Sequence, residues 1–313
     1  MALTARRLGK SMSETARQRI HSLRAYPTLE TWMNPLTRSL ARHFANQDWL
    51  KTQDEIDFTY RISDVVIGGR DCAAYETENT TDTDQIILYI HGGGIVSGSP
   101  RINASMILPT CHLSGVPGIG ASYTLLPEAR FPTQINEIDA VYKALLESHP
   151  NKDIILIGDS FGGGIAVSCL LKWRDEKIKL PSRVVLASPA LDGTGASDTH
   201  VTLDGHDPLM KSNGGRACRR LFNFYAPGQD LKNPMVSPIY GDLTGLPPTL
   251  IHVGSREILL GDAARFAEGL RRAGVQSTLR VFDGMFHLFH MHWALEEAKE
   301  AHADIAHFIA PRA

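Results

Sequence analysis

The sequence of 313 residues has no uninterrupted apolar run of about 18 residues, the length that a membrane-spanning helix requires. Its N-terminus also lacks the continuous apolar core of a secretory signal. Charge of one sign is not in excess, because the formal net charge is only −2, and this gives no electrostatic reason to expect binding to nucleic acid or to an anionic membrane. We therefore expect no nucleic-acid partner, no stable membrane association and a cytoplasmic location.

Cysteine is scarce, and its spacing carries no motif. The chain has four cysteines, at positions 72, 111, 169 and 218, and none forms a Cys-x-x-Cys pair. Three of them sit in apolar runs, which favours reduced thiols buried in a core. A chain of this length buries a large core and needs no disulfide bonds.

The first 24 residues are rich in arginine and lysine, which oppose a single acidic residue, Glu14. Together with several serines and threonines, this composition resembles an organelle transit peptide. It also fits an amphipathic helix of the folded protein, which is the interpretation we favour.

From residue 86 onward, short apolar runs alternate with segments of helical period. The runs have the length and composition of strands that are covered on both faces. They lie at residues 86–90, 119–123, 154–157, 184–187, 249–253 and 278–282. Before them, residues 57–67 alternate in the way of an outer strand, and residues 72–75 could pair with it as a hairpin. This order predicts an α/β fold: a mostly parallel sheet of about eight strands with helices on both faces.

One long segment interrupts the alternation. Between residues 190 and 248 there is no strong strand pattern, and insertions of this length in compact domains are usually lids or binding elements. We expect residues 192–232 to form a cap, to which helices from residues 1–50 contribute. The catalytic core would then consist of residues 51–191 and 233–313.

The strongest chemical signal is the sequence Gly-Asp-Ser-Phe-Gly at residues 158–162. It stands where an apolar run ends and a helical pattern begins, which is the setting of a nucleophile elbow. Glycines suit the sharp turn, because side chains there would clash with the neighbouring strand and helix. Ser160 is therefore the predicted nucleophile, at the carboxyl edge of the sheet where ligands bind in such folds.

A serine hydroxyl becomes a good nucleophile only when a neighbouring base takes its proton. In this fold the acid and then the histidine follow the serine along the chain. His287, just past the last predicted strand, is the expected base. The acid should follow the preceding strand, where Glu257 is the first candidate and Asp262 the second.

The sequence His-Gly-Gly-Gly at residues 91–94 also follows a predicted strand. Acyl transfer develops negative charge on the carbonyl oxygen, and backbone N–H groups must already point at it. We expect the amides of Gly92, Gly93 and Phe161 to form this oxyanion hole. By itself the glycine run could equally be a tight loop or a phosphate cradle, but its occurrence together with the elbow favours the catalytic interpretation.

Two other groups of residues have the composition of possible sites. His287, His290 and His292 could suggest a metal centre, but no nearby carboxylate completes one, so we expect no metal and no cofactor. The sequence His-Asp-Pro at residues 206–208 could touch a substrate from the cap, although a turn or helix start fits it better.

Together these motifs resemble the hormone-sensitive-lipase family of esterases (bacterial family IV), over nearly all of the chain from about residue 60. The resemblance also rests on residues 123–132, 233–238 and 245–248. It implies the α/β-hydrolase fold, carboxylesterase activity and a catalytic triad of Ser160, Glu257 and His287. Phe161 departs from the family pattern, since an alanine is usual there, and Arg256 stands where many members carry an acidic residue.

The predicted function is hydrolysis of short-chain or compact carboxylic esters, small-molecule substrates, through an acyl-enzyme. Phe161 and a cap with few large apolar residues favour acyl groups of roughly two to six carbons, since each buried methylene needs apolar surroundings. A thioesterase, lactonase, deacetylase or acyltransferase with the same triad is the alternative, and a catalytically silent ligand receptor is a more distant one. In similar esterases the edge of the last strand often pairs with its two-fold mate, which suggests a homodimer.

Overall fold

The computed structural model describes residues 12–23, 29–211 and 213–310. Within these ranges eight strands form one sheet in the order β1-β2-β4-β3-β5-β6-β7-β8. The strands are β1 (Tyr60–Ile67), β2 (Arg70–Thr77), β3 (Gln85–Ile90), β4 (Gly118–Ala121), β5 (Asp153–Asp159), β6 (Arg183–Ala187), β7 (Thr249–Gly254) and β8 (Ser277–Phe282). The β1–β2 and β2–β4 pairs are antiparallel and all others are parallel. The predicted α/β fold with a mostly parallel sheet is thus confirmed.

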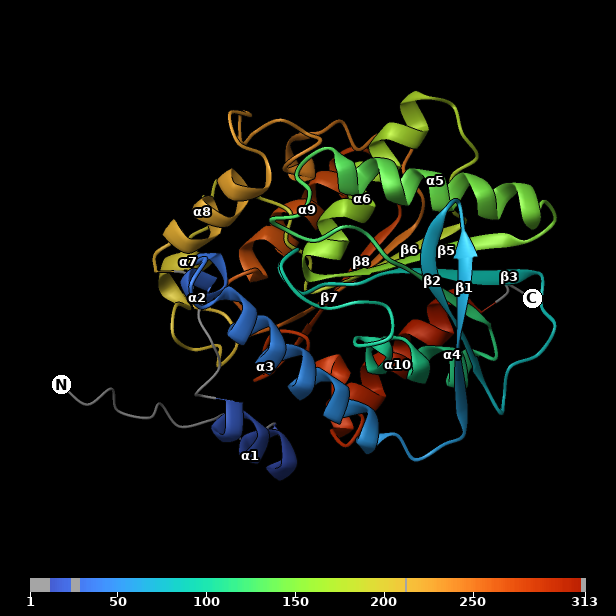
Figure 1. Cartoon of the computed structure of the whole chain (residues 1–313), viewed down its shortest axis with the longest axis horizontal. Coiled ribbons are helices and arrows are strands. Elements are labelled where there is room, and N and C mark those ends of the chain that lie inside the picture. Colours follow the sequence, from blue (N-terminus) through green and yellow to red (C-terminus); the bar gives the residue numbers. More distant parts are fainter. Residues whose placement is uncertain (1–11, 24–28, 212, 311–313) are drawn as a thin grey trace.

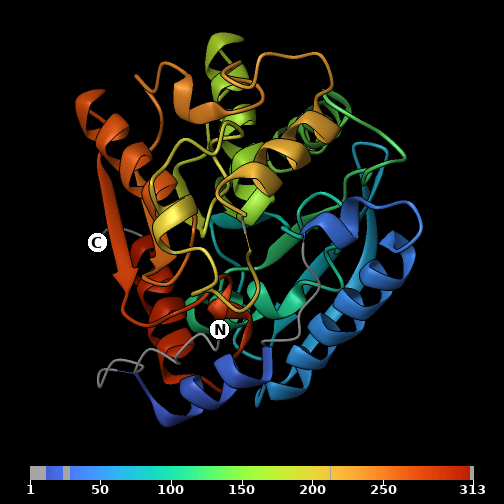
Figure 2. The same cartoon turned by 90° about the vertical axis from the view of Figure 1, so that its left-hand side faces the viewer.

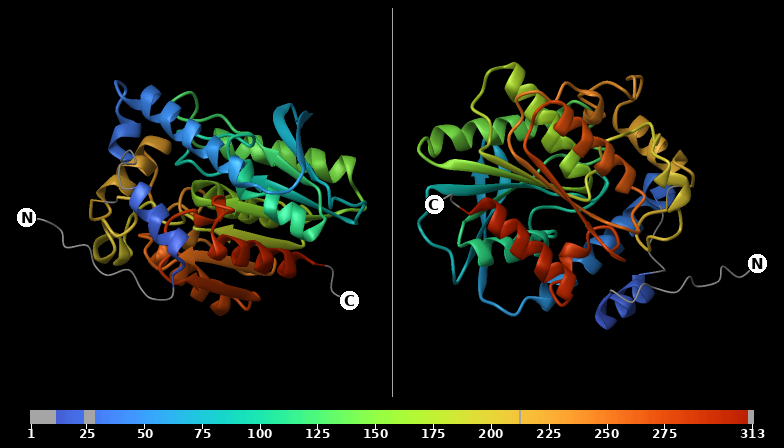
Figure 3. Two further views of the ribbon diagram at one scale, coloured as in Figure 1. Left: turned by 90° about the horizontal axis from the view of Figure 1, so that it is seen from below. Right: turned by 180° about the vertical axis from the view of Figure 1, so that it is seen from behind.

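Helices cover both faces of this sheet (Figures 1 and 3). Those within the described ranges are α1 (Glu14–Ser22), α2 (Leu29–Met33), α3 (Arg38–Lys51), α4 (Leu108–Ser114), α5 (Thr133–Ser148), α6 (Ser160–Asp175), α7 (Thr199–Thr202), α8 (Arg216–Tyr225), α9 (Leu260–Arg272) and α10 (Glu296–Ile309). Four short 3₁₀ helices are also described: η2 (Thr52–Glu55), η3 (Ala104–Met106), η4 (Pro238–Tyr240) and η5 (Phe289–Met291). Helices α5, α6 and α9 lie on one face of the sheet, and α4 and α10 on the other (Figure 1).

The burial of the strands follows their sequences. Every residue of β3 and β7 is buried, as the unbroken apolar runs predicted, because both faces carry helices. The outer strand β1 instead alternates between half-buried and exposed positions, and it forms the predicted hairpin with β2. The core therefore lies along the central strands.

The register of the sheet brings distant loops to one edge. Ile90 at the end of β3 is paired with Gly158 of β5, and Asp159 is paired with Ala187 of β6. At the same edge Gly254 of β7 is paired with Phe282 of β8. Because these strands are parallel, the segments that follow them meet at their carboxyl ends, where the site is found.

Helix α2 and the start of α3 lie against α8. Helix α2 contacts α8, and the guanidinium of Arg38 lies 5.2 Å from the ring centre of Phe224. Figure 2, in which the left-hand side of Figure 1 faces the viewer, shows these helices on the near side of the molecule. In α1, Ala16 and Ile20 are buried, and Ser13 caps the helix, so residues 14–22 form a helix of the folded protein. The basic residues at positions 6, 7, 10 and 24 lie outside the described residues.

All four cysteines are buried and free, as the sequence predicted. In the described part of the chain, no helix has both the length and the apolar character needed to cross a membrane.

Candidate active site

Ser160 lies at the turn between β5 and α6. Its φ is +50°, a left-handed backbone conformation that residues other than glycine rarely adopt. The glycines around it permit a close approach of chain segments. A Cβ on Gly162 would lie 2.3 Å from the carbonyl oxygens of both Ile90 and His91, and one on Gly158 would lie 2.9 Å from the carbonyl oxygen of Gly162. The glycines of the motif are therefore required for α6 to start directly against β3.

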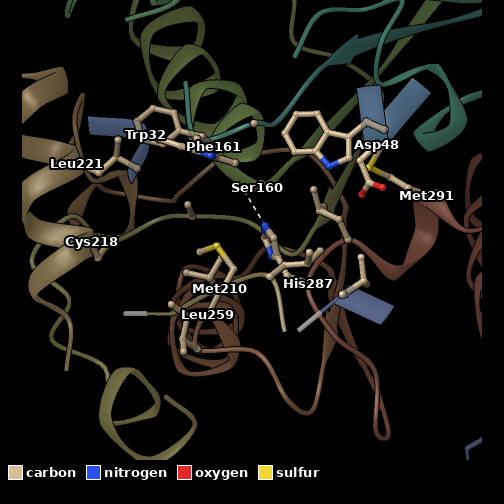
Figure 4. Close-up of a pocket in the computed structure, with 18 of the residues that line it drawn as sticks. Trp32, Asp48, Ser160, Phe161, Met210, Cys218, Leu221, Leu259, His287 and Met291 are labelled. Carbon is tan, nitrogen blue, oxygen red and sulfur yellow. Dashed lines mark hydrogen bonds between the residues drawn. The ribbon is translucent and has the colours of Figure 1, made fainter. Parts of the chain in front are cut away.

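Three side chains form a continuous hydrogen-bonded chain beneath the pocket. The Oγ of Ser160 lies 2.9 Å from Nε2 of His287 (Figure 4), and Nδ1 of His287 lies 2.8 Å from Oε2 of Glu257. Because the carboxylate can only accept, Nδ1 of the neutral imidazole carries the proton and Nε2 is left to accept the hydrogen of the serine. This is the arrangement in which a histidine can act as the base for a serine nucleophile.

Glu257 is held by further donors. Its Oε1 accepts hydrogen bonds from the amide of Gly254, at 2.6 Å, and from the hydroxyl of Ser188, at 2.7 Å. The carboxyl group is fully buried. Both oxygens are thus satisfied, and the side chain is fixed with Oε2 toward the imidazole.

Asp262, the second candidate for the acid, lies elsewhere. It is buried and accepts a hydrogen bond from the hydroxyl of Ser197, and one of its oxygens lies 4.0 Å from the guanidinium of Arg265. It belongs to a polar network around α9 that does not include His287. Of the two candidates, the structure brings only Glu257 to the histidine.

The environment of His287 makes its imidazole a stronger base. Burial alone would lower its pKa, but the hydrogen bond and negative charge of Glu257, with the charges of Asp207 and Asp159, outweigh this effect and leave the pKa raised. A raised pKa favours transfer of the serine proton to the imidazole.

Asp207 is a residue of the site that sequence reasoning underestimated. Its Oδ2 accepts a hydrogen bond from the backbone amide of His287, at 2.8 Å, and Oδ1 accepts from the amides of Leu209 and Met210. Burial raises the pKa of Asp207 to about 6. The Asp-Pro sequence did indicate a turn, but nothing in it identified a contact with a residue 80 positions away.

The glycine loop after β3 corrects one sequence prediction. The amide of Gly92 donates to Oδ1 of Asp159, at 3.0 Å, and the same oxygen accepts from the hydroxyl of Tyr89. The prediction that Gly92 belongs to the oxyanion hole is therefore wrong, because its N–H already has an acceptor away from the pocket. Gly93 and Gly94 line the pocket instead, beside Ser160 and Phe161.

The conformation of this loop demands glycine. Gly93 has a φ of +103°, and a Cβ there would lie 2.2 Å from the carbonyl oxygen of Ser97. Gly94 also has a positive φ, of +59°. The amide of Phe161 lies in the first turn of α6, where N–H groups have no acceptor within the helix. Gly93, Gly94 and Phe161 all line the pocket with Ser160, so their amides are the candidates for an oxyanion hole.

The pocket over Ser160 has a volume of about 830 Å³ including its opening to solvent. Its walls come from several parts of the chain that are far apart in the sequence. Leu23 at the end of α1, Trp32 of α2, and Asp48 and Trp49 of α3 form one part of the wall. Residues 192–232 provide His200, Leu209, Met210, Cys218, Leu221 and Phe222. Most of these side chains are apolar, so the pocket suits an uncharged, largely hydrocarbon group next to the serine.

Phe161 both lines the pocket and packs into a cluster of rings. Its ring centre lies 5.0 Å from that of Phe222 and 5.1 Å from that of Tyr225. The side chain is only 4% exposed. Phe161 therefore packs in the core and lines the pocket beside the nucleophile at the same time.

No group of three or more His, Cys, Asp or Glu side chains in the described ranges is arranged to hold a metal ion. His290 and His292 point to different partners: His290 approaches His252, and His292 lies 3.6 Å from Glu55.

Comparisons with known proteins agree with this geometry. A family model for the alpha/beta hydrolase fold matches residues 87–291. An esterase of Acinetobacter venetianus is 37% identical over 237 residues, which cover 74% of this chain and 77% of that protein. An acetyl-hydrolase of Streptomyces hygroscopicus is 34% identical over 240 residues, covering 76% of this chain and 79% of the relative. The crystal structure of an esterase from the bacterial hormone-sensitive lipase family, 30% identical, matches with a TM-score of 0.83 and covers 95% of this chain and 97% of the other.

This chain therefore belongs to the α/β-hydrolase fold family and, within it, to the hormone-sensitive-lipase family of bacterial esterases. It is a carboxylic ester hydrolase.

Proposed function

We propose that the protein hydrolyses esters of short acyl groups through an acyl-enzyme on Ser160, with His287 as base and Glu257 as its acid partner. The observation that carries this proposal is the unbroken hydrogen-bonded chain from Oγ of Ser160 through His287 to Glu257, at the floor of an apolar pocket. Release of p-nitrophenol from p-nitrophenyl acetate by the purified protein tests it directly.

The proposed cycle has two halves. Ser160 attacks the ester carbonyl while its proton moves to Nε2 of His287, and Glu257 stabilises the imidazolium that forms. The amides of Gly93, Gly94 and Phe161 donate to the oxygen that becomes negative. The imidazolium then gives its proton to the leaving alcohol. In the second half a water molecule gives a proton to His287 and attacks the acyl-enzyme. His287 then returns this proton to Oγ of Ser160 as the bond to the acyl group breaks and the carboxylic acid leaves.

Asp207 acts as a positioning residue in this scheme. Its hydrogen bond to the backbone of His287 ties the segment after β8 (residues 283–292, the histidine loop) to the turn at residues 207–210. We propose that residues 192–232, joined by helices from residues 1–50, form a cap over the core of residues 51–191 and 233–313. The pocket residues that these two segments contribute support this division.

Phe161 is expected to limit the length of the acyl group. In the wild type, activity should be highest for acyl groups of roughly two to six carbons, because the ring cluster occupies space that a longer chain would need. Phe161→Ala should shift the optimum toward longer chains. A series of p-nitrophenyl esters of increasing length, measured with both proteins, checks this. An unchanged profile in the variant, or a wild type that prefers twelve-carbon esters, would contradict it.

We further propose a homodimer formed through β8. Within the described residues β8 has a neighbouring strand on one side only, and Val281 is 47% exposed there. An open edge of this kind presents unpaired N–H and C=O groups to a second copy. Light scattering should give twice the mass of the 34.4 kDa chain at micromolar concentration, and a mass of one chain would exclude this dimer.

The cytoplasm is the proposed location. The four buried, free cysteines support a reducing compartment, because thiols remain unpaired there.

A further inference from the structure

The wall of the active-site pocket carries one unusual side chain, Asp48 of α3. Of the described residues that line the pocket, Asp48 alone is an Asp, Glu, Lys or Arg. Its side chain is half-buried, and Figure 4 shows it among the side chains that line the pocket. An ester that fills the pocket must therefore take water away from a carboxylate, which is costly unless the ester itself supplies a partner.

The position of Asp48 relative to the nucleophile indicates which part of an ester it would meet. In Figure 4 Asp48 and Met291 lie on one side of Ser160 and His287, and Cys218 and Leu221 lie on the other. His287 must protonate the departing alcohol, so the alcohol part leaves on the side of the histidine loop. Leu288, Met291 and His292 of that loop line the pocket. Asp48 thus borders the space of the alcohol part rather than that of the acyl group.

Aromatic rings stand in the same wall. Trp49 follows Asp48 in α3, and its ring packs edge-to-face with that of Trp32, with centres 6.2 Å apart and planes at 84°. Both tryptophans line the pocket. Indole faces attract cations, and together with a carboxylate they make a surface suited to a substituted ammonium group.

The neighbouring groups do not cancel the charge of Asp48. His292 is another polar residue of this wall, and burial lowers its pKa, which favours the neutral imidazole. Arg19, the cation near His292, forms a salt bridge with Glu55. The described pocket wall therefore presents a carboxylate beside the space for the alcohol part of the ester, and it has no Lys or Arg that would balance this charge.

We propose that the preferred esters carry an alkylammonium group in their alcohol part, and that Asp48 and Trp49 hold this group. This inference rests on the proposed esterase function and adds the substrate class to it. A positive alcohol part would replace the water removed from Asp48 with an ion pair and a cation–π contact. A neutral alcohol part of the same shape would leave the carboxylate without a partner.

Two esters of nearly equal shape separate these cases: acetylcholine and its uncharged analogue, 3,3-dimethylbutyl acetate. In the wild type, kcat/KM for acetylcholine should exceed that for the analogue about tenfold or more, the size of effect that a partly desolvated cation–π contact and ion pair give. In Asp48→Asn the ratio should fall by about threefold or more, because the cationic ester loses the carboxylate and keeps only the contact with Trp49, while the neutral ester no longer covers a charge. Added salt should lower the wild-type ratio.

The matched control is Asp54→Asn. Asp54 lies in η2, is exposed and does not line the pocket, so this variant changes the net charge equally without touching the wall. Its ratio should equal that of the wild type. An equal fall in both variants would assign the preference to the overall field of the protein and overturn the role of Asp48.

The remaining outcomes are also decisive. A wild-type ratio near one, with p-nitrophenyl acetate still cleaved, would overturn this inference and leave the esterase function standing. A preference only for a cationic acyl group, measured with the ethyl ester of trimethylammonioacetate, would overturn the placement beside the alcohol part. Failure to cleave any of these esters, p-nitrophenyl acetate included, would overturn the proposed function itself.

Discussion

Ser160→Ala is expected to lower kcat for p-nitrophenyl acetate by about a million-fold, and His287→Ala by a similar factor. Without the hydroxyl no acyl-enzyme can form, and without the imidazole the hydroxyl keeps its proton. The double variant should be no worse than either single one, because the two side chains act as a unit. Initial rates, with circular dichroism to show that the variants fold, check this expectation.

Covalent labelling gives a second readout of the same prediction. A fluorophosphonate should label the wild type at Ser160 and should fail to label Ser160→Ala. Ser168→Ala is the matched control, because Ser168 is also a buried serine of α6 but does not line the pocket. Substantial esterase activity or labelling that persists in Ser160→Ala would rule out this residue as the nucleophile.

Features carried by local sequence were predictable here. The unbroken apolar runs of β3 and β7 predicted strands covered on both faces, and their burial confirms it. The elbow at Ser160 could be recognised because its glycines, its strand and its helix are contiguous. The order of the chain then placed a histidine after the last strand and an acid after the strand before it.

Features that depend on long-range contacts were not predictable in the same way. Gly92 and Gly93 look alike in the sequence, but only the structure shows that the amide of Gly92 is turned to Asp159. The hydrogen bond from the amide of His287 to Asp207 joins segments 80 residues apart, and no local pattern marks it. No sequence motif marks Asp48 within α3, and its place in the pocket follows from how α3 packs over the core.

The second large effect on kcat is expected from replacing the acid of the triad, for which the sequence offered Glu257 and Asp262. Glu257→Gln is expected to lower kcat by about a thousand- to ten-thousand-fold, as for the loss of the acid in other serine hydrolases. Glu257 accepts hydrogen bonds on both oxygens, from the amide of Gly254 and from His287. A glutamine has one acceptor oxygen, so its NH₂ must face a donor on one side. If it faces the imidazole, Nδ1 must accept, the proton moves to Nε2, and the histidine can no longer take the proton of Ser160.

Asp262→Asn should change the stability of the protein rather than its kcat. Asp262 accepts from Ser197 and lies near Arg265, whose guanidinium is also 2.6 Å from Asp192. Because the group is buried, the amide should lower the free energy of unfolding by about 1–3 kcal/mol while kcat stays near that of the wild type. Thermal unfolding and initial rates, measured on both variants at one pH, separate the two roles. A loss of kcat in Asp262→Asn greater than that in Glu257→Gln would transfer the acid role to Asp262, against the 2.8 Å contact that links Glu257 to His287.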